Sequence, residues 1–426
     1  MLYLFIIMNR ETNTENTINY NNKLLLIDEY LRDFDQQEVD YIRKNFCGKV
    51  INENDIEESS SNNLLYICGD IEAVYNKVSA FKSDNIYVIK DLSYNIDVND
   101  NNNKYTLIDI GAVPINLHNV GVYFRSFFDG NKDYFTSIEN EHKFQSLTES
   151  NKPNNAFRKG IYLTNVTQNM TDTDSLKFNL LRCSSNLDGP TENFRETDRE
   201  VVDKVNHIAS FFFDQKATLN HVLAQIYQNH VVVDGDREQQ KKAKIKEHSD
   251  KTKDMPRNAL MAFCTFYNGL ESLKQTKASE TNRYDYTYKG TSVLTSMRFR
   301  LKPSVKECDH LVKQFDVPLY PNSVFLISLW ANRLYTHEVM PSILPVDKIP
   351  TRMGYVIRCS NKEAVHKNGK TYVLQDGNEI ELVEPDPEGV TKLKNIYYEE
   401  NMNDNMVYYD NFYFSLNSGD YLKPTI

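Results

Sequence analysis

Short apolar runs separated by polar turns dominate the chain, and near its start they alternate with helical patterns. The stretches KLLLID, NLLYICG and NIYVIKDL have the length and composition of buried strands. Between them, residues 29–46 and 70–81 place apolar side chains at helical spacing. Strands that alternate with helices predict a small α/β domain, which we assign to residues 21–95.

A polar stretch separates this unit from the rest of the chain. NIDVNDNNNK shows no apolar periodicity, so we interpret residues 96–104 as a linker. Residues 105–426 are rich in β-branched and aromatic runs with turns between them, and residues 196–214 have the pattern of an amphipathic helix. The apolar run at the start is too short to span a membrane. We expect residues 1–20 to be a disordered extension, with a peripheral membrane anchor as the alternative.

Composition narrows the class of protein. The 426 residues are 40% hydrophobic and 25% charged, which is typical of a globular chain. A net charge of −10 argues against a protein held to nucleic acid by an overall basic surface, but a local basic groove remains compatible with it. Six cysteines without a CxxC pair predict reduced, mostly buried thiols and an intracellular protein, cytoplasmic or nuclear. No phosphate-binding glycine motif occurs in residues 21–95, so we expect a scaffold or partner-binding role there.

One histidine stands out from the nine in the chain. Only His248 is followed two residues later by a carboxylate, Asp250, and such a pair faces one side of a strand. His337 comes later, at the end of the strand-like run SVFLISLWANRLYTHEVMP. Two histidines and one carboxylate form the facial triad of non-haem Fe(II) oxygenases, which leaves positions for a cosubstrate and dioxygen. The alternative is a helix-capping aspartate beside a surface histidine.

Two arginines follow in an extended apolar segment. In TRMGYVIR, Arg352 and Arg358 are six residues apart, so both point to the same face of a strand. A buried guanidinium requires an anion, and its planar fork suits a carboxylate. We therefore expect Arg352 to anchor an acidic ligand. Arg358 either contacts the same ligand or forms an ion pair with Asp250.

The motifs HSD, NRLYTHEVMPS and TRMGYVIR resemble, in order and spacing, the AlkB-like branch of the Fe(II)/2-oxoglutarate dioxygenases. The resemblance covers about residues 220–360. It implies an α+β protein whose core, about residues 200–362, is a double-stranded β-helix of the jelly-roll or cupin-like type, with flanking helices. The family strand has asparagine and threonine at its middle inward positions, where this chain has Gly354 and Val356.

The resemblance also implies roles for single residues and three cofactors or cosubstrates: Fe(II), 2-oxoglutarate and O2. His248, Asp250 and His337 would bind the iron. Arg352 would pair with the far carboxylate of 2-oxoglutarate, and Arg358 would lie near its iron-bound end. Tyr227 is at the position of a family tyrosine that hydrogen-bonds the cosubstrate.

The substrate is less well defined by the sequence. The resemblance favours a modified nucleobase in DNA or RNA, and Lys251 and Lys253, beside the metal motif, would contact its backbone. Arg158, in the loop ESNKPNNAFRKG, would reach the same side. The alternatives are hydroxylation of a protein side chain and a catalytically silent binding module with the same fold. We expect no membrane partner, and the sequence indicates no oligomeric state.

Overall fold

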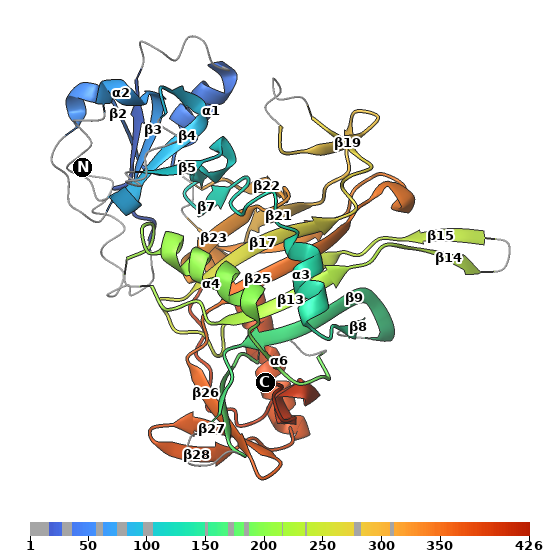
Figure 1. Ribbon diagram of the computed structural model, residues 1–426. Helices are drawn as coiled ribbons and strands as arrows, with labels where there is room; N and C mark the ends of the chain where they lie inside the picture. The colour runs from blue at the N-terminus through green and yellow to red at the C-terminus, as the bar shows by residue number, and fades with distance from the viewer. Residues whose placement is uncertain are drawn as a thin grey trace.

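The fold is mixed α+β and consists mostly of strands, arranged in mainly antiparallel sheets and one parallel sheet (Figure 1). Four cysteines are free and buried, as predicted: Cys47, Cys68, Cys264 and Cys359. Cys183, Cys308 and the predicted linker beyond Ile96 lie outside the described residues. The computed structural model describes residues 17–27, 36–56, 63–74, 83–96, 105–149, 152–168, 174–182, 187–214, 216–234, 237–276, 283–306 and 311–426.

The N-terminal part contains the parallel sheet, in the strand order β2-β1-β3-β4-β5. The three predicted strands and the first predicted helix are present, whereas β2 and β5 were not predicted. Strand β5 follows the predicted linker, so this sheet takes one strand from residues 105–426. The elements are β1 (Lys23–Leu26), α1 (Gln36–Asn45), β2 (Lys49–Ile51), β3 (Leu65–Asp70), α2 (Ile71–Val74), β4 (Ile86–Tyr94) and β5 (Thr106–Ile108).

Two sheets, antiparallel except for the pairing of β12 with β9, face each other in the centre of the molecule. The larger sheet has the order β12-β9-β13-β25-β17-β23-β7-β6, with β8 beside β9, and the smaller has the order β16-β24-β21-β22. The larger sheet contains β6 (Ile115–Leu117), β7 (Gly121–Phe124), β8 (Gln145–Glu149), β9 (Lys152–Thr164), β12 (Glu192–Asn193), β13 (His221–Tyr227), β17 (Leu260–Asn268), β23 (Val324–Ser328) and β25 (Thr351–Arg358). The smaller contains β16 (Ile245–His248), β21 (Ser296–Leu301), β22 (Gln314–Pro318) and β24 (Tyr335–Met340).

Eight of these strands pass back and forth between the two sheets. In chain order the eight strands are β13, β16, β17, β21, β22, β23, β24 and β25. Numbered one to eight, they form the orders one-eight-three-six in the larger sheet and two-seven-four-five in the smaller. Phe263 on β17 contacts His337 on β24, and Phe299 on β21 contacts Phe325 on β23, so the sheets enclose a shared core. This arrangement is consistent with a double-stranded β-helix, the fold expected for about residues 200–362.

Two helices cover the outer face of the larger sheet (Figure 1). These are α3 (Tyr134–Glu141) and α4 (Glu196–Ala209), and α4 confirms the helix predicted within residues 196–214. Val201, Val205 and Ile208 are buried at helical spacing on one side of α4. The Tyr355 hydroxyl on β25 donates to Asp198 at the start of α4, with an O–O distance of 2.7 Å. Helix α4 thus fixes the position of β25 from behind.

The C-terminal part adds a further sheet, in the order β10-β11-β26-β27-β28, and the helix α6. Strands β14 and β15 form a ribbon that projects from the centre (Figure 1), and β18, β19 and β20 form a small sheet. The remaining bounds are β10 (Thr167–Gln168), β11 (Leu176–Leu180), β14 (His230–Asp234), β15 (Arg237–Lys241), β18 (Lys274–Gln275), β19 (Tyr286–Tyr288), β20 (Thr291–Ser292), α5 (Leu329–Leu334), β26 (Lys362–Lys367), β27 (Lys370–Gln375), β28 (Asn378–Glu381) and α6 (Pro387–Met402).

The described end of the N-terminal extension is held in place. Residues 1–16 lie outside the described ranges, but Ile18 forms a bridge with Phe213, and the Asn19 amide donates to the Phe212 carbonyl at 2.7 Å. The prediction of disorder is therefore wrong for residues 17–20, because these contacts pair their backbone. Among the described residues, no helix is both long and apolar enough to cross a membrane.

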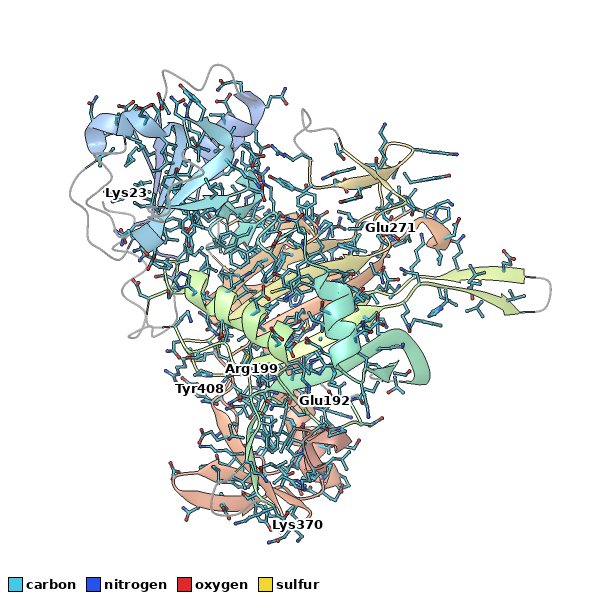
Figure 2. The ribbon with its side chains drawn as sticks, in the orientation of Figure 1. Lys23, Glu192, Arg199, Glu271, Lys370 and Tyr408 are labelled. Atoms are coloured by element: carbon cyan, nitrogen blue, oxygen red, sulfur yellow. The ribbon has the colours of Figure 1, made fainter. Side chains whose placement is uncertain are left out.

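A buried ionic cluster links the end of α3 to α4. His142 donates from Nδ1 to Glu192, labelled in Figure 2, at 2.9 Å and from Nε2 to Asp198 at 2.6 Å. Burial alone would lower the pKa of His142, but the hydrogen bonds to Asp198 and Glu192 outweigh it and raise the pKa to about 9. His142 is therefore an imidazolium at neutral pH and joins two carboxylates.

This cluster predicts a loss of stability at alkaline pH. Because the folded-state pKa is raised, the stabilisation is complete below the unfolded-state value near 6.5 and disappears as the pH rises through about 9. We expect the free energy of unfolding to fall by about 2 kcal/mol between pH 6.5 and pH 9.5, measured by urea denaturation. In His142→Gln this pH-dependent loss should be absent. An equal loss in the wild type and the variant would contradict the role of His142.

Candidate metal centre

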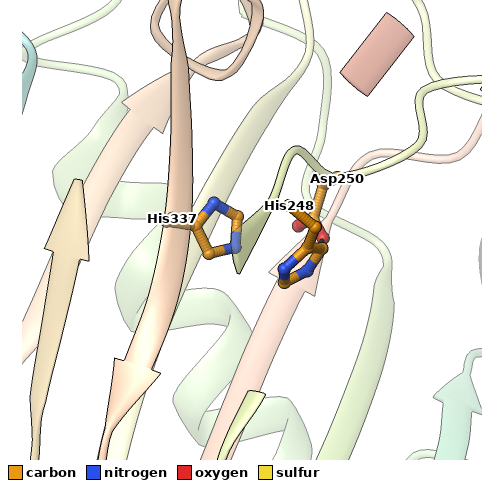
Figure 3. Close-up of side chains that lie close together, drawn as sticks. All are labelled: His248, Asp250 and His337. Atoms are coloured by element: carbon orange, nitrogen blue, oxygen red, sulfur yellow. Dashed lines mark ion pairs between the residues drawn. The ribbon is translucent and has the colours of Figure 1, made fainter. Parts of the chain in front are cut away.

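Two strands of the smaller sheet bring the candidate metal ligands together. Strand β16 pairs with β24 so that His248 lies directly opposite His337, and their ring centroids are 4.5 Å apart. The Nε2 atom of His248 is 3.6 Å from Oδ1 of Asp250. One donor atom from each of the three side chains lies within 4.8 Å of the others, and Figure 3 shows them converging. The geometry supplies two imidazoles and one carboxylate for a single ion.

The route to this convergence differs from the expected one. We expected His248 and Asp250 to share the face of one strand, but β16 ends at His248, and Asp250 lies in the following loop. Asn332 fixes this loop, because its side chain accepts from the Asp250 amide and donates to the Asp250 carbonyl, both at 2.9 Å. The two ligands converge through these side-chain hydrogen bonds rather than through strand alternation.

The two imidazoles have different surroundings. Nδ1 of His248 donates to the Lys246 carbonyl at 2.9 Å, and Nε2 is the ring nitrogen that faces Asp250. His337 is 4% exposed, and its Nδ1 is buried without a hydrogen-bond partner. Burial, followed by the neighbouring His248, lowers the pKa of His337 to about 3. Metal binding requires neutral imidazoles, and the lowered pKa keeps His337 neutral at neutral pH.

Arg358 holds the third ligand as a carboxylate. Its Nη2 and Nε atoms donate to Oδ2 of Asp250 at 2.8 and 3.2 Å. Burial would raise the pKa of Asp250, but the Arg358 guanidinium holds it well below its usual range. This ion pair was one of the two predicted roles for Arg358, while its contact with a cosubstrate stays a prediction. Oδ1, the oxygen nearest His248, is left for a metal ion.

The inner face of the larger sheet is ordered in rows of directly opposed residues on adjacent strands. The arginine row contains Arg158, Tyr227, Arg352 and Tyr267; the glycine row contains Gly160, Gln225, Gly354 and Thr265; and the next row contains Tyr162, Leu223, Val356 and Phe263. Successive rows are two residues, or about 7 Å, apart along the strands. Phe263 contacts His337 with ring centroids 5.5 Å apart, so the metal site lies above this third row.

Arg352 points from its row toward the metal site. Arg352 is 5% exposed, and its Nε and Nη2 atoms are buried without a hydrogen-bond partner. A Cβ atom on Gly354 would lie 3.0 Å from Nη1 of Arg352, so the guanidinium leans over the glycine row. The glycine, which departs from the family pattern, makes room for it. The guanidinium over the glycine row is thus about one row from the row that contacts His337.

Tyr227 is the nearest neighbour of Arg352. The Arg352 Cζ atom lies 3.8 Å from the centre of the Tyr227 ring, and the Tyr227 hydroxyl donates to Gln225 at 3.3 Å. A cavity of about 10 Å³ between these residues and Ser342 has room for about one water molecule. The structure therefore brings Tyr227 to Arg352, while the predicted hydrogen bond of Tyr227 to a cosubstrate stays a prediction.

The two lysines predicted at the mouth of the site have other partners. The Lys253 side chain is only 3% exposed, and its Nζ atom is 3.7 Å from Asp254. The Lys251 ammonium lies 4.4 Å from the centre of the Tyr397 ring on α6. Their expected role as contacts to a nucleic-acid backbone is not supported, because one is buried and the other packs on an aromatic face.

The C-terminal helix supports the metal loop, which the sequence did not indicate. The Ser249 amide donates to Asn401 at 2.7 Å, and the amide and hydroxyl of Thr252 both donate to Glu400. Lys302 is buried and donates to the Glu400 carbonyl at 2.7 Å. These residues of α6 follow the metal motif by about 150 positions, so no local spacing could have revealed them.

A second cluster of possible metal donors exists among the described residues. It contains Glu141, His142 and Asp198, on the outer side of the larger sheet. Here His142 is already hydrogen-bonded to Asp198 and Glu192, Glu141 accepts from Thr197, and the protonated His142 has no lone pair to offer. The cluster of His248, Asp250 and His337 instead combines an ionised carboxylate with the neutral His337.

The comparisons with known proteins are sparse. No family model and no curated protein matches the chain. One similar structure is the non-heme alpha ketoglutarate dependent epimerase SnoN from nogalamycin biosynthesis, with a TM-score of 0.28 and 8% identity over 57% of this chain and 80% of that one. Another is the Fe(II)/alpha-ketoglutarate-dependent dioxygenase TqaL, with a TM-score of 0.21 and 12% identity over 58% of this chain and 76% of that one. Neither is similar enough to carry an argument, and the AlkB-like branch stays a prediction.

The contact from α6 predicts a measurable effect on metal binding. In Asn401→Ala the Ser249 amide loses its acceptor, so the loop that carries Asp250 becomes less ordered. We expect the affinity for Co(II), measured by titration of its absorbance, to fall by about tenfold. The control is Asn405→Ala, on an exposed residue beyond the same helix. Unchanged Co(II) affinity in Asn401→Ala would show that α6 does not position the metal loop.

Proposed function

We propose that the protein is an Fe(II)- and 2-oxoglutarate-dependent oxygenase. The observation that carries this proposal is the pairing of a His-Asp-His cluster with an unpartnered buried guanidinium about one row away. A buried guanidinium with unpaired N–H groups is costly, and a ligand carboxylate would satisfy them. A dicarboxylate that also reaches the metal satisfies both ends of the site. The spacing of HSD, NRLYTHEVMPS and TRMGYVIR supports the AlkB-like branch.

The residues present fit both groups. His248, His337 and Asp250 would hold Fe(II), since two neutral imidazoles and a carboxylate with open positions suit that ion. Arg352 would hold the far carboxylate of 2-oxoglutarate. When bound, iron, 2-oxoglutarate and dioxygen supply the oxidising chemistry for hydroxylation or oxidative demethylation at a substrate C–H bond.

The chain contributes charge, orientation and the exclusion of water. Arg358 keeps Asp250 ionised and turns one of its oxygens toward His248. The hydrogen bond from Nδ1 of His248 to Lys246 orients the ring so that Nε2 faces Asp250. Phe263 and Phe299 pack against the His337 ring and keep this side of the site dry.

For the substrate, we propose a modified nucleobase in DNA or RNA. Support comes from Lys244 and Lys246, which are exposed on the segment that leads directly into His248. Two exposed ammonium groups beside the site can pair with a phosphate backbone, although the whole chain carries a net charge of −10. A protein side chain is the alternative substrate. A binding module without turnover is the third possibility. The presence of all three proposed metal ligands argues against it.

The metal ligands predict the outcome of a turnover assay. We expect the wild type to release succinate from 2-oxoglutarate in the presence of Fe(II). His248→Ala and Asp250→Ala should each lower this rate by more than about 100-fold, because two donors cannot hold the ion in the required geometry. His230→Ala, on an exposed histidine of β14, is the matched control. Full turnover in either ligand variant would refute the metal site, and no turnover in the wild type would favour the binding module.

The proposed substrate predicts a salt-dependent contact. We expect binding of a short methylated oligonucleotide to weaken with salt, and the slope of log K against log salt to shrink by about 0.7 to 0.9 for each lysine removed in Lys244→Gln/Lys246→Gln. The control is Lys367→Gln/Lys370→Gln at the far end of the molecule, where Figure 2 labels Lys370. Succinate release stimulated by a peptide, with oligonucleotide binding unchanged in Lys244→Gln/Lys246→Gln, would favour a protein substrate instead.

A further inference from the structure

A second arginine flanks the proposed cosubstrate anchor. Arg158 on β9 lies directly opposite Tyr227 on β13, and Tyr227 lies directly opposite Arg352 on β25. Directly opposed residues in antiparallel strands place their side chains on the same face of the sheet. Tyr227 is therefore flanked by an arginine on each neighbouring strand, and the Arg352 guanidinium packs on its ring.

Both guanidinium groups have unpaired polar atoms. The Nε atom of Arg158 is buried without a hydrogen-bond partner, as are the Nε and Nη2 atoms of Arg352. Within the described residues, neither arginine forms an ion pair, in contrast to Arg358 with Asp250. The other members of the arginine row and the glycine row are uncharged. These two cations, with three unpaired N–H groups among uncharged neighbours in their rows, would be satisfied by an anion from outside the chain.

The surroundings limit the kind of anion. A guanidinium presents its donors in a plane, and a planar carboxylate matches them. Arg352 is 5% exposed, whereas Arg158 is half-buried, so an anion would meet Arg158 first and Arg352 deeper in the site.

We propose that Arg158 and Arg352 form one carboxylate-binding site on both sides of Tyr227 and that this site selects a dicarboxylate cosubstrate. The inference rests on the proposed function, because it concerns the far carboxylate of 2-oxoglutarate. It changes the role of Arg158, which the sequence suggested as a contact to the substrate. Arg158 becomes a residue that determines the specificity for the cosubstrate.

Binding of glutarate, which has both carboxylates but no keto group, tests the site without turnover. Calorimetry with the full-length Mn(II)-loaded protein should show glutarate binding weakened about tenfold in Arg158→Gln, the loss expected for one charge-assisted hydrogen bond. Arg352→Gln should lose at least as much, and Arg158→Lys, which keeps the charge but not the planar fork, should lose less than Arg158→Gln. The control is Lys159→Gln, because Lys159 is on the opposite face of β9.

Two further measurements separate this role from a structural one. The affinity for Mn(II) should be unchanged in Arg158→Gln, and in the succinate assay the variant should raise the KM for 2-oxoglutarate about tenfold with little change in kcat. Unchanged glutarate affinity in Arg158→Gln would overturn the proposal. Inorganic phosphate that binds more tightly than glutarate, and loses affinity in Arg158→Gln, would overturn the carboxylate assignment.

The failure of this inference differs from the failure of the proposed function. If the wild type binds glutarate through both arginines but releases no succinate, the carboxylate site stands and the oxygenase proposal fails. If succinate is released and Arg158→Gln changes neither the KM nor glutarate binding, the oxygenase proposal stands and the role of Arg158 fails.

Discussion

The ion pair between Asp250 and Arg358 is the interaction on which the candidate site depends. A buried carboxylate is costly without a partner, and removal of one member of such a pair costs about 3 to 5 kcal/mol. Arg358 is the last residue of β25, whereas Asp250 lies in the loop after β16, so the pair joins the two facing sheets. Asn332 and Asn401 then hold the backbone of the same loop. The metal ligands are in place because this loop has almost no freedom.

The two sheets contribute different side chains to the site. The smaller sheet presents the histidines through the β16–β24 pairing, and the larger sheet presents the two unpartnered arginines in one row. Gly354 keeps the space between these ends free of a side chain. Outside the larger sheet, Asp198 on α4 anchors β25 through Tyr355. The strand that carries Arg352 and Arg358 is thus fixed from behind while its inner face stays available to a ligand.

Local spacing in the sequence was sufficient to predict where some residues of the site lie, and insufficient for others. The positions of Arg352 and Arg358 on one face follow from the two-residue period of a strand, and the structure confirms it. Lys251 and Lys253 were expected to face a ligand, because a charged loop residue looks solvent-exposed until its tertiary neighbours are known. Here those neighbours are Tyr397, far along the chain, and the ion-paired Asp254. The support from α6 was missed for the same reason, since the helix contacts the metal loop only after the chain has folded back.

The sequence by itself determined the candidate ligands, the two arginines and the strand-rich core, because each leaves a mark within a few residues. Only the tertiary structure decided that Asp250 converges with His248 through a loop held by Asn332, and that Arg358 forms an ion pair with Asp250. It also decided that Arg158 flanks Tyr227 opposite Arg352. These outcomes depend on which strands become neighbours. The pairing of β13 with β9 and β25 joins residues separated by 57 to 137 positions, and short-range periodicity carries no information at that distance.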